Sequence, residues 1–206
     1  MALPVIKRTR DGAATRLRIE KEALRLFATK GVDGTTIRDL ALAVGVADAA
    51  LYRYFTSKEE IASAIFLRHY GALAQEIRRI GELALPLPET IGELVALLCR
   101  LFDDEPDVFA FILLNQHAHL RYVQTDANAV EELRVIMQGA IARGDINLKD
   151  PDLAAAIALG SVLQPAVFKV YGRLNGRLSD RSMELTQAAL GSVGASKRAP
   201  AEPCGD

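Results

Sequence analysis

Apolar residues recur along most of the chain at intervals of three and four positions, which is the spacing of one face of an α-helix. The strict alternation that indicates β-strands is nearly absent. The first apolar stripe lies within residues 15–30, ahead of a helix-ending glycine, and consists of Ile19, Ala23, Leu26 and Phe27. This pattern predicts an all-α fold of about nine helices without an internal repeat.

Two short helices are predicted in the next segment. Thr35 is the expected N-cap of a helix over 36–44, because a threonine side chain can accept a hydrogen bond from a free N–H of the first turn. Gly45 breaks this helix, and a second short helix is expected over 47–55. The two helices are therefore joined by a tight turn.

A long helix follows, and five more are expected after it. Ser57 and Glu60 form a capping-box pattern, in which each side chain accepts from the backbone N–H of the other. The helix that begins there must end before Pro86. The later helices are expected around the apolar stripe 91–102, over 106–121, over 128–143, over 151–174 with a kink at Pro165, and over 180–190.

The composition is that of an ordinary globular protein with one large domain or two small ones. The chain has 206 residues, of which 50% are apolar and 25% are charged. No apolar run reaches the roughly 18 residues that span a bilayer, and the N-terminus lacks a signal-peptide core. Cys99 and Cys204 lack the spacing of a disulfide framework or a zinc ribbon. We therefore expect a cytoplasmic protein with no membrane segment, no metal site and no cofactor.

A net charge of −1 conceals an asymmetry along the chain. Residues 1–60 contain 11 Lys and Arg against 8 Asp and Glu, so the remainder carries a net charge of −4. A basic segment on an acidic body indicates a polyanionic partner, although a solvated surface can have the same composition. We divide the chain at this point, into residues 1–60, residues 61–192, and a tail over 193–206 whose composition predicts disorder.

Residues 35–58 have the pattern of a helix-turn-helix, in which the second helix enters the major groove of DNA. Three of the 12 aromatic residues of the chain fall within four positions here. Phe55 is expected in the small core. Tyr52 lies one helical turn after Asp48 and shares its outward face, where a phenolic hydroxyl can reach a phosphate.

This segment resembles the N-terminal domain of TetR-type transcriptional regulators. The resemblance covers residues 16–61 and is carried at fixed spacing by Ala23, Phe27, Gly31, Thr35, Thr36, Ala41, Gly45, Val46, Leu51, Tyr52, Tyr54, Phe55, Ser57, Lys58 and Glu59. Weaker similarity continues to residues 160–174, which look like the penultimate, dimer-forming helix of that family.

The resemblance implies a ligand-responsive transcriptional regulator that acts as a repressor. Residues 1–60 would be a three-helix DNA-binding domain, and residues 61–192 a helical bundle for ligand binding and dimerisation. A homodimer, formed through the helices near 151–174 and 180–190, would bind a palindromic operator in double-stranded DNA. A small-molecule effector would release it.

By position, the resemblance also assigns DNA contacts to residues of both short helices and of the turn after them. The expected contacts are Thr35, Thr36, Arg38, Asp48, Ala49, Ala50, Tyr52, Tyr54 and Lys58. Asp48, Ala49 and Ala50 would face base edges, and the tyrosines and the lysine would face phosphates. Two alternatives stay open: Tyr54 could be part of the core, and Arg38 could be solvated only. Arg8, Arg10 and Arg16 form either a basic arm or an unordered N-terminus.

Two residues depart from the family pattern at the start of the second short helix. Ala47 stands where the family often has a serine N-cap, which forgoes a cap worth about 1 kcal/mol. Asp48 brings a negative charge to the expected reading position, partly compensated by the helix dipole. Its carboxylate could accept a hydrogen bond from cytosine N4. The operator sequence of relatives therefore cannot be transferred to this chain.

The effector site is harder to locate in the sequence. Aromatic and apolar residues with a few neutral polar ones could line a cavity for a hydrophobic or aromatic small molecule, or could be the core and polar rim of a bundle. The candidates are Phe102, Phe109, Leu113, Gln116, His117, Gln164 and Phe168. His117 and His119 point about 200° apart on a helix, so they cannot bind one metal together.

Two other functional classes are alternatives to a regulator. An enzyme is disfavoured, because the sequence has no phosphate-binding glycine loop, no metalloprotease motif and no nucleophile elbow. Asp103, Asp104 and Glu105 form an acidic cluster, but beside Pro106 they are more typical of a solvated helix cap. A helical ligand-binding or adaptor module without specific DNA binding is the second alternative, and Ala47 and Asp48 would be its signature.

Overall fold

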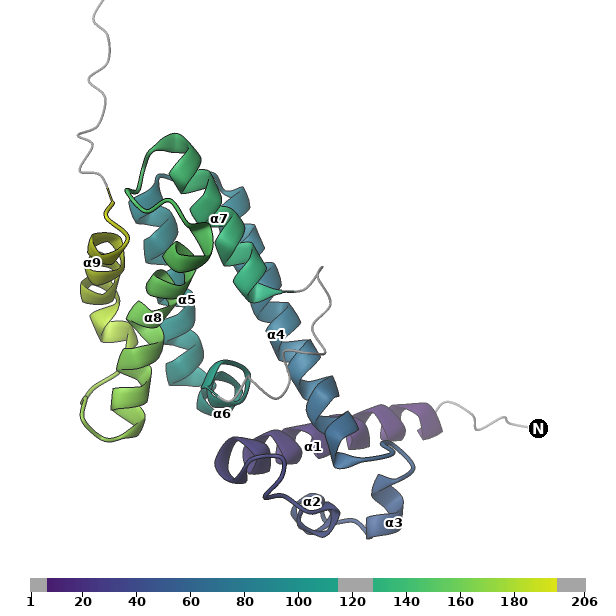
Figure 1. The fold of residues 1–206 in the computed structure, drawn as a ribbon. Coiled ribbons are helices and arrows are strands. Elements are labelled where there is room, and N and C mark those ends of the chain that lie inside the picture. Colours follow the sequence, from purple (N-terminus) through teal and green to yellow (C-terminus); the bar gives the residue numbers. More distant parts are fainter. Residues whose placement is uncertain (1–6, 115–127, 196–206) are drawn as a thin grey trace, which may run out of the picture. The chain divides into compact units, whose positions relative to one another are not determined.

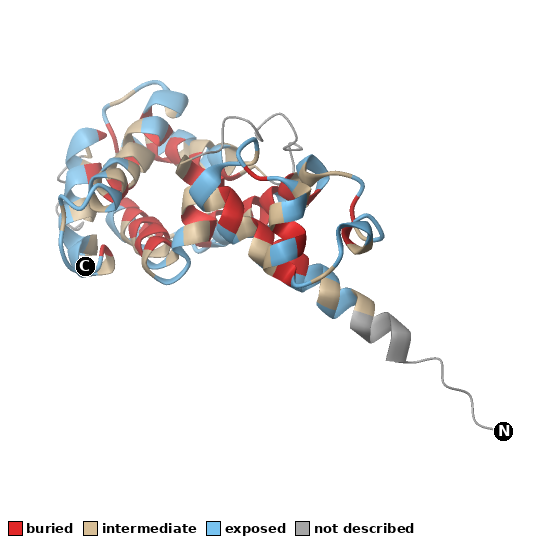
Figure 2. Ribbon diagram, turned by 90° about the horizontal axis from the view of Figure 1, so that it is seen from below, coloured by how far each residue is buried: buried red, intermediate tan, exposed pale blue. Residues whose placement is uncertain are grey.

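The structure is a computed structural model that describes residues 7–114 and 128–195, with side chains described from residue 12 onward (Figure 1). Within these residues it has nine α-helices, a π-helical segment, a short 3₁₀-helix and no strand, so the predicted all-α fold is confirmed. The only β-type pairing in this part is an isolated bridge between Ile146 and Ala195. Buried and exposed residues alternate around the helices, as the apolar stripes predict (Figure 2).

Contacts between residues divide the chain into two compact units. The first contains Met1–Ala72 and Glu105–Gln124, and the second contains Leu73–Asp104 and Thr125–Asp206. The first unit therefore continues past residue 60 and takes in a later segment of the chain. The functional boundaries expected at residues 60 and 192 stay predictions.

The first unit begins with α1 (Lys7–Lys30), which is followed by Gly31 with a φ of 73°. Three further helical segments follow: α2 (Ile37–Val44), α3 (Asp48–Leu51) and the first turns of α4 (Lys58–Glu82). Apolar side chains from all of them are almost fully buried, including Ile19, Phe27, Leu40, Leu51, Phe55 and Ile61. The expected burial of Phe55 in the small core is thus confirmed, and Leu51 is buried there as well.

A segment from later in the chain packs into the same unit. α6 (Pro106–Phe109) continues into a wider π-helical turn, η1 (Ala110–Leu114). The ring of Phe111 lies 6.0 Å from that of Phe27 on α1 and 6.4 Å from that of Phe66 on α4, measured between centroids. Aromatic pairs at these separations stabilise beyond the area they bury. The helix was predicted to reach about Arg121, and its remainder lies outside the described residues.

The second unit contains the end of α4 and four more α-helices. These are α5 (Leu87–Asp104), α7 (Ala129–Arg143), α8 (Pro151–Val170) and α9 (Ser182–Ser192), with a 3₁₀ turn, η5 (Ser179–Arg181), before the last. The predicted start of α8 at residue 151 is confirmed, and Asp150 caps the helix by accepting from the N–H of Asp152 at 2.9 Å. The helix ends at Val170 rather than near 174, since Gly172, with a φ of 70°, turns the chain there.

The acidic cluster at the end of α5 joins distant parts of this unit. The side chain of Asp103 is only 5% exposed and accepts hydrogen bonds from the N–H groups of Leu178 and Ser179, both at 2.9 Å. It also accepts from the Ser179 hydroxyl at 2.6 Å. Asp104 pairs with the guanidinium of Arg177 at 2.7 Å. The expectation of a solvated cap is therefore wrong for Asp103, which fixes the turn that leads into α9.

The most apolar helix of the chain is only partly covered. α8 has a mean hydropathy of 1.7, and it is the one helix in the described residues that is long and apolar enough to cross a membrane by length and composition alone. This criterion tolerates charged residues such as Asp152 and Lys169, so it is broader than the uninterrupted apolar run considered in the sequence, and a core helix can also meet it. Only 28% of the most apolar 18-residue stretch of α8 is buried, and Leu153 and Phe168 are among the exposed residues of this helix.

Candidate nucleic-acid interface and effector cavity

The first short helix of the candidate interface is capped one residue later than the sequence predicted. Thr36, not Thr35, is the N-cap of α2: its hydroxyl accepts from the N–H of Asp39, and the Asp39 carboxylate accepts from the N–H of Thr36 at 2.9 Å. The Asp39 carboxylate also accepts from the hydroxyl of Thr36 at 2.7 Å, and the two hydrogen bonds that it accepts from Thr36 lower the pKa of the Asp39 carboxyl. Thr35 is fully buried, and its hydroxyl donates to the carbonyl of Gly31 at 2.7 Å. Thr36 is exposed, so only one of the two threonines can meet DNA.

Lys58 is held by carbonyl groups of the turn between α1 and α2. Its Nζ donates to the carbonyl oxygens of Val32, Asp33 and Thr35 at 2.9, 3.3 and 3.0 Å. An ammonium has three hydrogens, so these acceptors account for all of them. The lysine that the family resemblance assigns to a phosphate thus connects the first turn of α4 to the loop ahead of α2.

The second short helix is shorter than predicted and presents small residues to solvent. α3 covers Asp48–Leu51, where a helix over 47–55 was expected. Ala47 is the N-cap and provides no side-chain hydrogen bond, as its residue type predicts. Asp48 and Ala49 are exposed and Ala50 is half-buried, so the three residues expected to read bases lie at or near the surface.

The turn after α3 carries aromatic and basic side chains. Tyr52 is 56% exposed, which confirms its predicted outward position, and Tyr54 is half-buried. Arg38 on α2 and Arg53 in this turn are both exposed. Sequence reasoning missed Arg53, although a basic residue between two candidate phosphate contacts was a usable signal.

Arg16 is not a free basic arm, because it has two partners within the first unit. Its Nε lies 3.3 Å from the carboxylate of Glu20, and its guanidinium lies 4.5 Å from the ring centroid of Phe55. Arg68 on α4 contacts the other oxygen of the same carboxylate. Arg8 and Arg10 have side chains outside the described residues.

The start of α4 differs in detail from the predicted capping box. The hydroxyl of Ser57 accepts from the N–H of Glu60 at 3.1 Å, as expected. The Glu60 carboxylate, however, accepts from the hydroxyl and the N–H of Thr56, both at 2.6 Å, rather than from Ser57. These two bonds lower the pKa of Glu60. The carboxylate therefore fixes the turn between α3 and α4.

The residues expected to bind an effector are divided between the two units. Phe109 and Leu113 are buried in the first unit. Phe102, Gln164 and Phe168 belong to the second unit, where Phe102 is buried while the two residues of α8 are exposed. Gln116 and His117 lie outside the described residues. The set as a whole stays a prediction.

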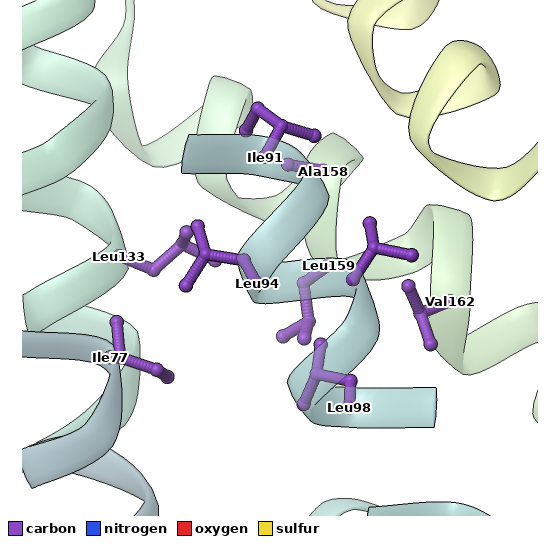
Figure 3. A pocket seen from close by; sticks show the side chains of 9 residues that line it. Ile77, Ile91, Leu94, Leu98, Leu133, Ala158, Leu159 and Val162 are labelled. Carbon is purple, nitrogen blue, oxygen red and sulfur yellow. The ribbon is translucent and has the colours of Figure 1, made fainter. Parts of the chain in front are cut away.

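An apolar cavity does occur inside the second unit, and none of the predicted residues lines it. Side chains from α4, α5, α7 and α8 converge on it (Figure 3), among them Ile77, Leu94, Leu98, Leu133, Leu159 and Val162. Its volume of about 30 Å³ is the room of roughly one water molecule. Small-molecule pockets measure roughly 300–1,000 Å³, so a ligand can enter only if lining side chains move.

A larger, more polar cleft lies between the end of α4, the start of α5 and α7. It has a volume of about 570 Å³ and includes Arg78, Arg143 and Glu132. Arg78 is paired with Glu132 at 2.6 Å, and Arg143 with Asp145 at 2.7 Å. Its cationic groups are thus already matched by carboxylates of the same unit.

Comparison with known proteins agrees with this geometry. A family model described as "Bacterial regulatory proteins, tetR family" matches residues 19–65. The regulator TcmR of Streptomyces glaucescens is 33% identical over 199 residues, which cover 91% of this chain and 82% of TcmR. The chain belongs to the TetR family. SrpR of Pseudomonas putida is 26% identical over 201 residues, covering 94% of this chain and 90% of SrpR.

Solved structures of the TetR family share the fold. A TetR family regulator from Marinobacter aquaeolei VT8 gives a TM-score of 0.73 at 19% identity, covering 92% of this chain and all of that one. FadR from Bacillus subtilis, solved in complex with stearoyl-CoA, gives 0.70 at 18% identity, with 86% and 98% covered. This TetR-family protein is therefore a DNA-binding transcriptional regulator with an all-α fold.

Proposed function

We propose that this regulator is a ligand-responsive repressor that binds an inverted-repeat operator as a homodimer in the cytoplasm. The observation that carries the proposal is the exposed surface formed by α3 and the turn after it, where Asp48, Ala49 and Tyr52 stand free of the core. A helix whose exposed side chains are small can enter the major groove of DNA. The exposed tyrosine beside it can contact a flanking phosphate.

We assign different DNA contacts to the two short helices. Thr36 and the N-terminus of α2 face a phosphate, with Arg38 beside them on the same helix. Asp48, Ala49 and Ala50 face base edges. Asp48 repels phosphate but can accept a hydrogen bond from cytosine N4, so it favours particular bases rather than raising affinity in general. Tyr52 and Tyr54 contact the backbone.

The exposed stripe of α8 supports the homodimer. Along this helix the exposed residues Leu153, Ala156, Gln164 and Phe168 and the half-buried Gly160 follow helical spacing. Small residues in the middle of the stripe allow another helix to approach closely, and larger apolar residues flank them. Met183 on α9, 73% exposed, adds to the apolar area. A second copy of this chain, related by a two-fold axis, would cover both helices.

For the effector we propose a hydrophobic or aromatic small molecule that expands the apolar cavity of the second unit. The side chains that line the cavity are hydrocarbon, so a charged metabolite would lose its hydration without compensation. Ala158→Leu would fill this space and should abolish thermal stabilisation by an effector. Ala142→Leu, on the exposed face of α7, is the matched control that should leave the response intact.

The test of DNA binding is selection of fragments from a random duplex pool by the full-length protein. We expect an inverted repeat with half-site centres about 34–36 Å apart. Asp48→Asn should change the preferred base, whereas Asp33→Asn, also exposed, should not. Failure to select any fragment would favour the alternative function, a ligand-binding or adaptor module without specific DNA binding. The negative charge of Asp48 on the reading face of α3 is also consistent with that alternative.

A further inference from the structure

Three cations lie in the helix-turn-helix segment, residues 35–58, and they differ in what they already bind. Arg38, Arg53 and Lys58 would contribute equally if charge alone decided DNA affinity. The structure separates them. Lys58 has its ammonium surrounded by three carbonyl oxygens, while Arg38 and Arg53 are exposed.

Lys58 is in a poor position to neutralise a phosphate. Turning its Nζ towards DNA would break the hydrogen bonds to Val32, Asp33 and Thr35, and would leave those carbonyls without their charged donor. The same loop carries the buried Thr35 and leads directly into the Thr36 cap of α2. Lys58 therefore fixes the loop from which α2 starts.

Arg53 has the opposite environment. It follows the exposed Tyr52 in the turn that ends α3, and no side-chain hydrogen bond or ion pair of its guanidinium occurs among the described residues. Its backbone is fixed, because its N–H donates to the carbonyl of Ala50 at 3.4 Å and Tyr54 donates to that of Leu51 at 2.9 Å. A guanidinium offers donors in a fork that matches two phosphate oxygens, so its position suits a backbone contact.

We infer that Arg53 is the basic phosphate contact beside the reading helix, and that Lys58 is a positioning residue that holds the loop ahead of α2. The inference rests on the proposed DNA-binding function and goes beyond it, since it exchanges the roles that residue type and family position give to these two cations. Arg53 supplies affinity without regard to sequence. Lys58 supports preference for the selected sequence indirectly, because it orients α2, whose phosphate contact sets the register of the reading helix α3 on the bases.

The experiment measures the affinity of the full-length protein for a selected fragment and for a random fragment of equal length, at several salt concentrations. Log affinity falls with log salt, and each lost phosphate contact makes this negative slope shallower by about 0.9. Arg53→Gln should show this loss and weaken both fragments by a similar factor, while Arg53→Lys should keep the slope. Arg100→Gln, an exposed charge change on α5, should alter neither.

Lys58→Met should behave differently on the same two fragments. We expect its salt slope to stay within about 0.3 of the unaltered protein, while its affinity for the selected fragment falls towards that for the random one. Lys58→Arg should restore the preference, because a guanidinium can donate to the same carbonyls. Thermal midpoints of all variants show whether the fold persists, and Arg53→Gln tests the inference even if Lys58→Met does not fold.

The roles would be overturned if Lys58→Met lost a unit of slope and Arg53→Gln did not. They would also be overturned if Lys58→Met kept its preference for the selected fragment. Absence of any salt-dependent DNA binding by the unaltered protein is a separate result, which would overturn the proposed function itself.

Discussion

Glu20 is a charged residue buried in the first unit, with 4% of its surface exposed. Its carboxylate lies between Arg16, 3.3 Å away on the same helix, and Arg68 on α4. A carboxylate removed from water needs such partners, since an unpaired buried charge costs several kcal/mol. At this one residue, electrostatics joins α1 to α4.

Replacing Arg68 should therefore destabilise the protein more than replacing an ordinary surface arginine. Arg68 is 48% exposed and Arg16 remains as a partner, so we expect Arg68→Met to lower the free energy of unfolding by about 1–2 kcal/mol. Arg25→Met removes an exposed pair with Glu22 and should cost less than about 0.5 kcal/mol. Urea denaturation at pH 7 compares the two. Equal midpoints would show that Glu20 does not depend on Arg68.

Residue types alone could not assign the roles of side chains at the candidate interface. Thr35 and Thr36 are identical neighbours, yet one is buried on Gly31 and the other caps α2. Lys58 and Arg53 are both basic, yet one is bound by a distant loop. Sequence showed that these positions belong to a helix-turn-helix. Only the contacts, which depend on how residues 31–36 fold back on α4, show which side chains remain for DNA.

At the scale of elements, the carboxylate of Asp103 connects the end of α5 with the turn that precedes α9. Asp103 accepts hydrogen bonds from two backbone N–H groups and one hydroxyl of the turn at Leu178 and Ser179. Burial alone would raise the pKa of Asp103, but these hydrogen bonds and the nearby Arg177 outweigh it and leave the pKa lowered. The turn before α9 is thus most stable when Asp103 is ionised.

The pH dependence of stability should report this connection. Because the folded pKa is lowered, the contribution of Asp103 is present above its unfolded pKa, about 3.9, and disappears as the pH falls through the folded value. We expect Asp103→Asn to destabilise by about 1–3 kcal/mol at pH 7 and by progressively less below pH 4. Asp104→Asn, at a position 57% exposed, is the control. Thermal midpoints between pH 7 and pH 2.5 measure both, and a constant difference across this range would contradict the assignment.

The long helices and the short α2 were predictable, whereas the bounds of α3 and the irregular turn η1 were not. Asn128 and Asp150 cap α7 and α8, and Gly144 ends α7; these are local signals, and the two helices begin within one residue of the predicted positions 128 and 151. α3 is a single turn, and the π-helical turn at Ala110–Leu114 has no local signature. In this turn Phe111 packs on Phe27 and Phe66, which are far away in the sequence. Helical periodicity describes contacts within one helix, so it cannot predict structure that depends on packing between distant segments.

At the scale of the whole molecule, apolar surface is distributed unevenly between a small internal cavity and an exposed helix face. The cavity lined by α4, α5, α7 and α8 is small, while α8 exposes much of a strongly apolar surface. A stripe with Leu153 and Phe168 exposed by nearly half is unusual on the surface of a monomer. The proposed homodimer accounts for this surface, and the sequence had already placed it on the same helices.

A charge in the middle of the stripe should therefore separate the two copies. Gly160 has no neighbouring atom within 4 Å of the position where a side chain would begin, so Gly160→Arg fits within one copy. In a dimer the same guanidinium would be buried against the partner helix, and burying an unpaired charge is costly. We expect the unaltered protein to sediment as a dimer at micromolar concentration and Gly160→Arg as a monomer. Val135→Arg, at an exposed apolar position on α7, should remain dimeric.

DNA binding should follow the change in assembly. A dimer presents two reading helices to the two half-sites of an inverted repeat, and the second contact then forms within one complex at high effective concentration. Gly160→Arg should thus lose roughly 100-fold or more in affinity for the full inverted repeat, while its weak affinity for a single half-site stays within about threefold of the unaltered protein. Fluorescence anisotropy with both fragments, at protein concentrations below dimer dissociation and above it, distinguishes these effects. A Gly160→Arg protein that remains dimeric would exclude α8 as the interface, and a monomeric unaltered protein that binds a half-site as tightly as the full repeat would exclude the symmetric complex.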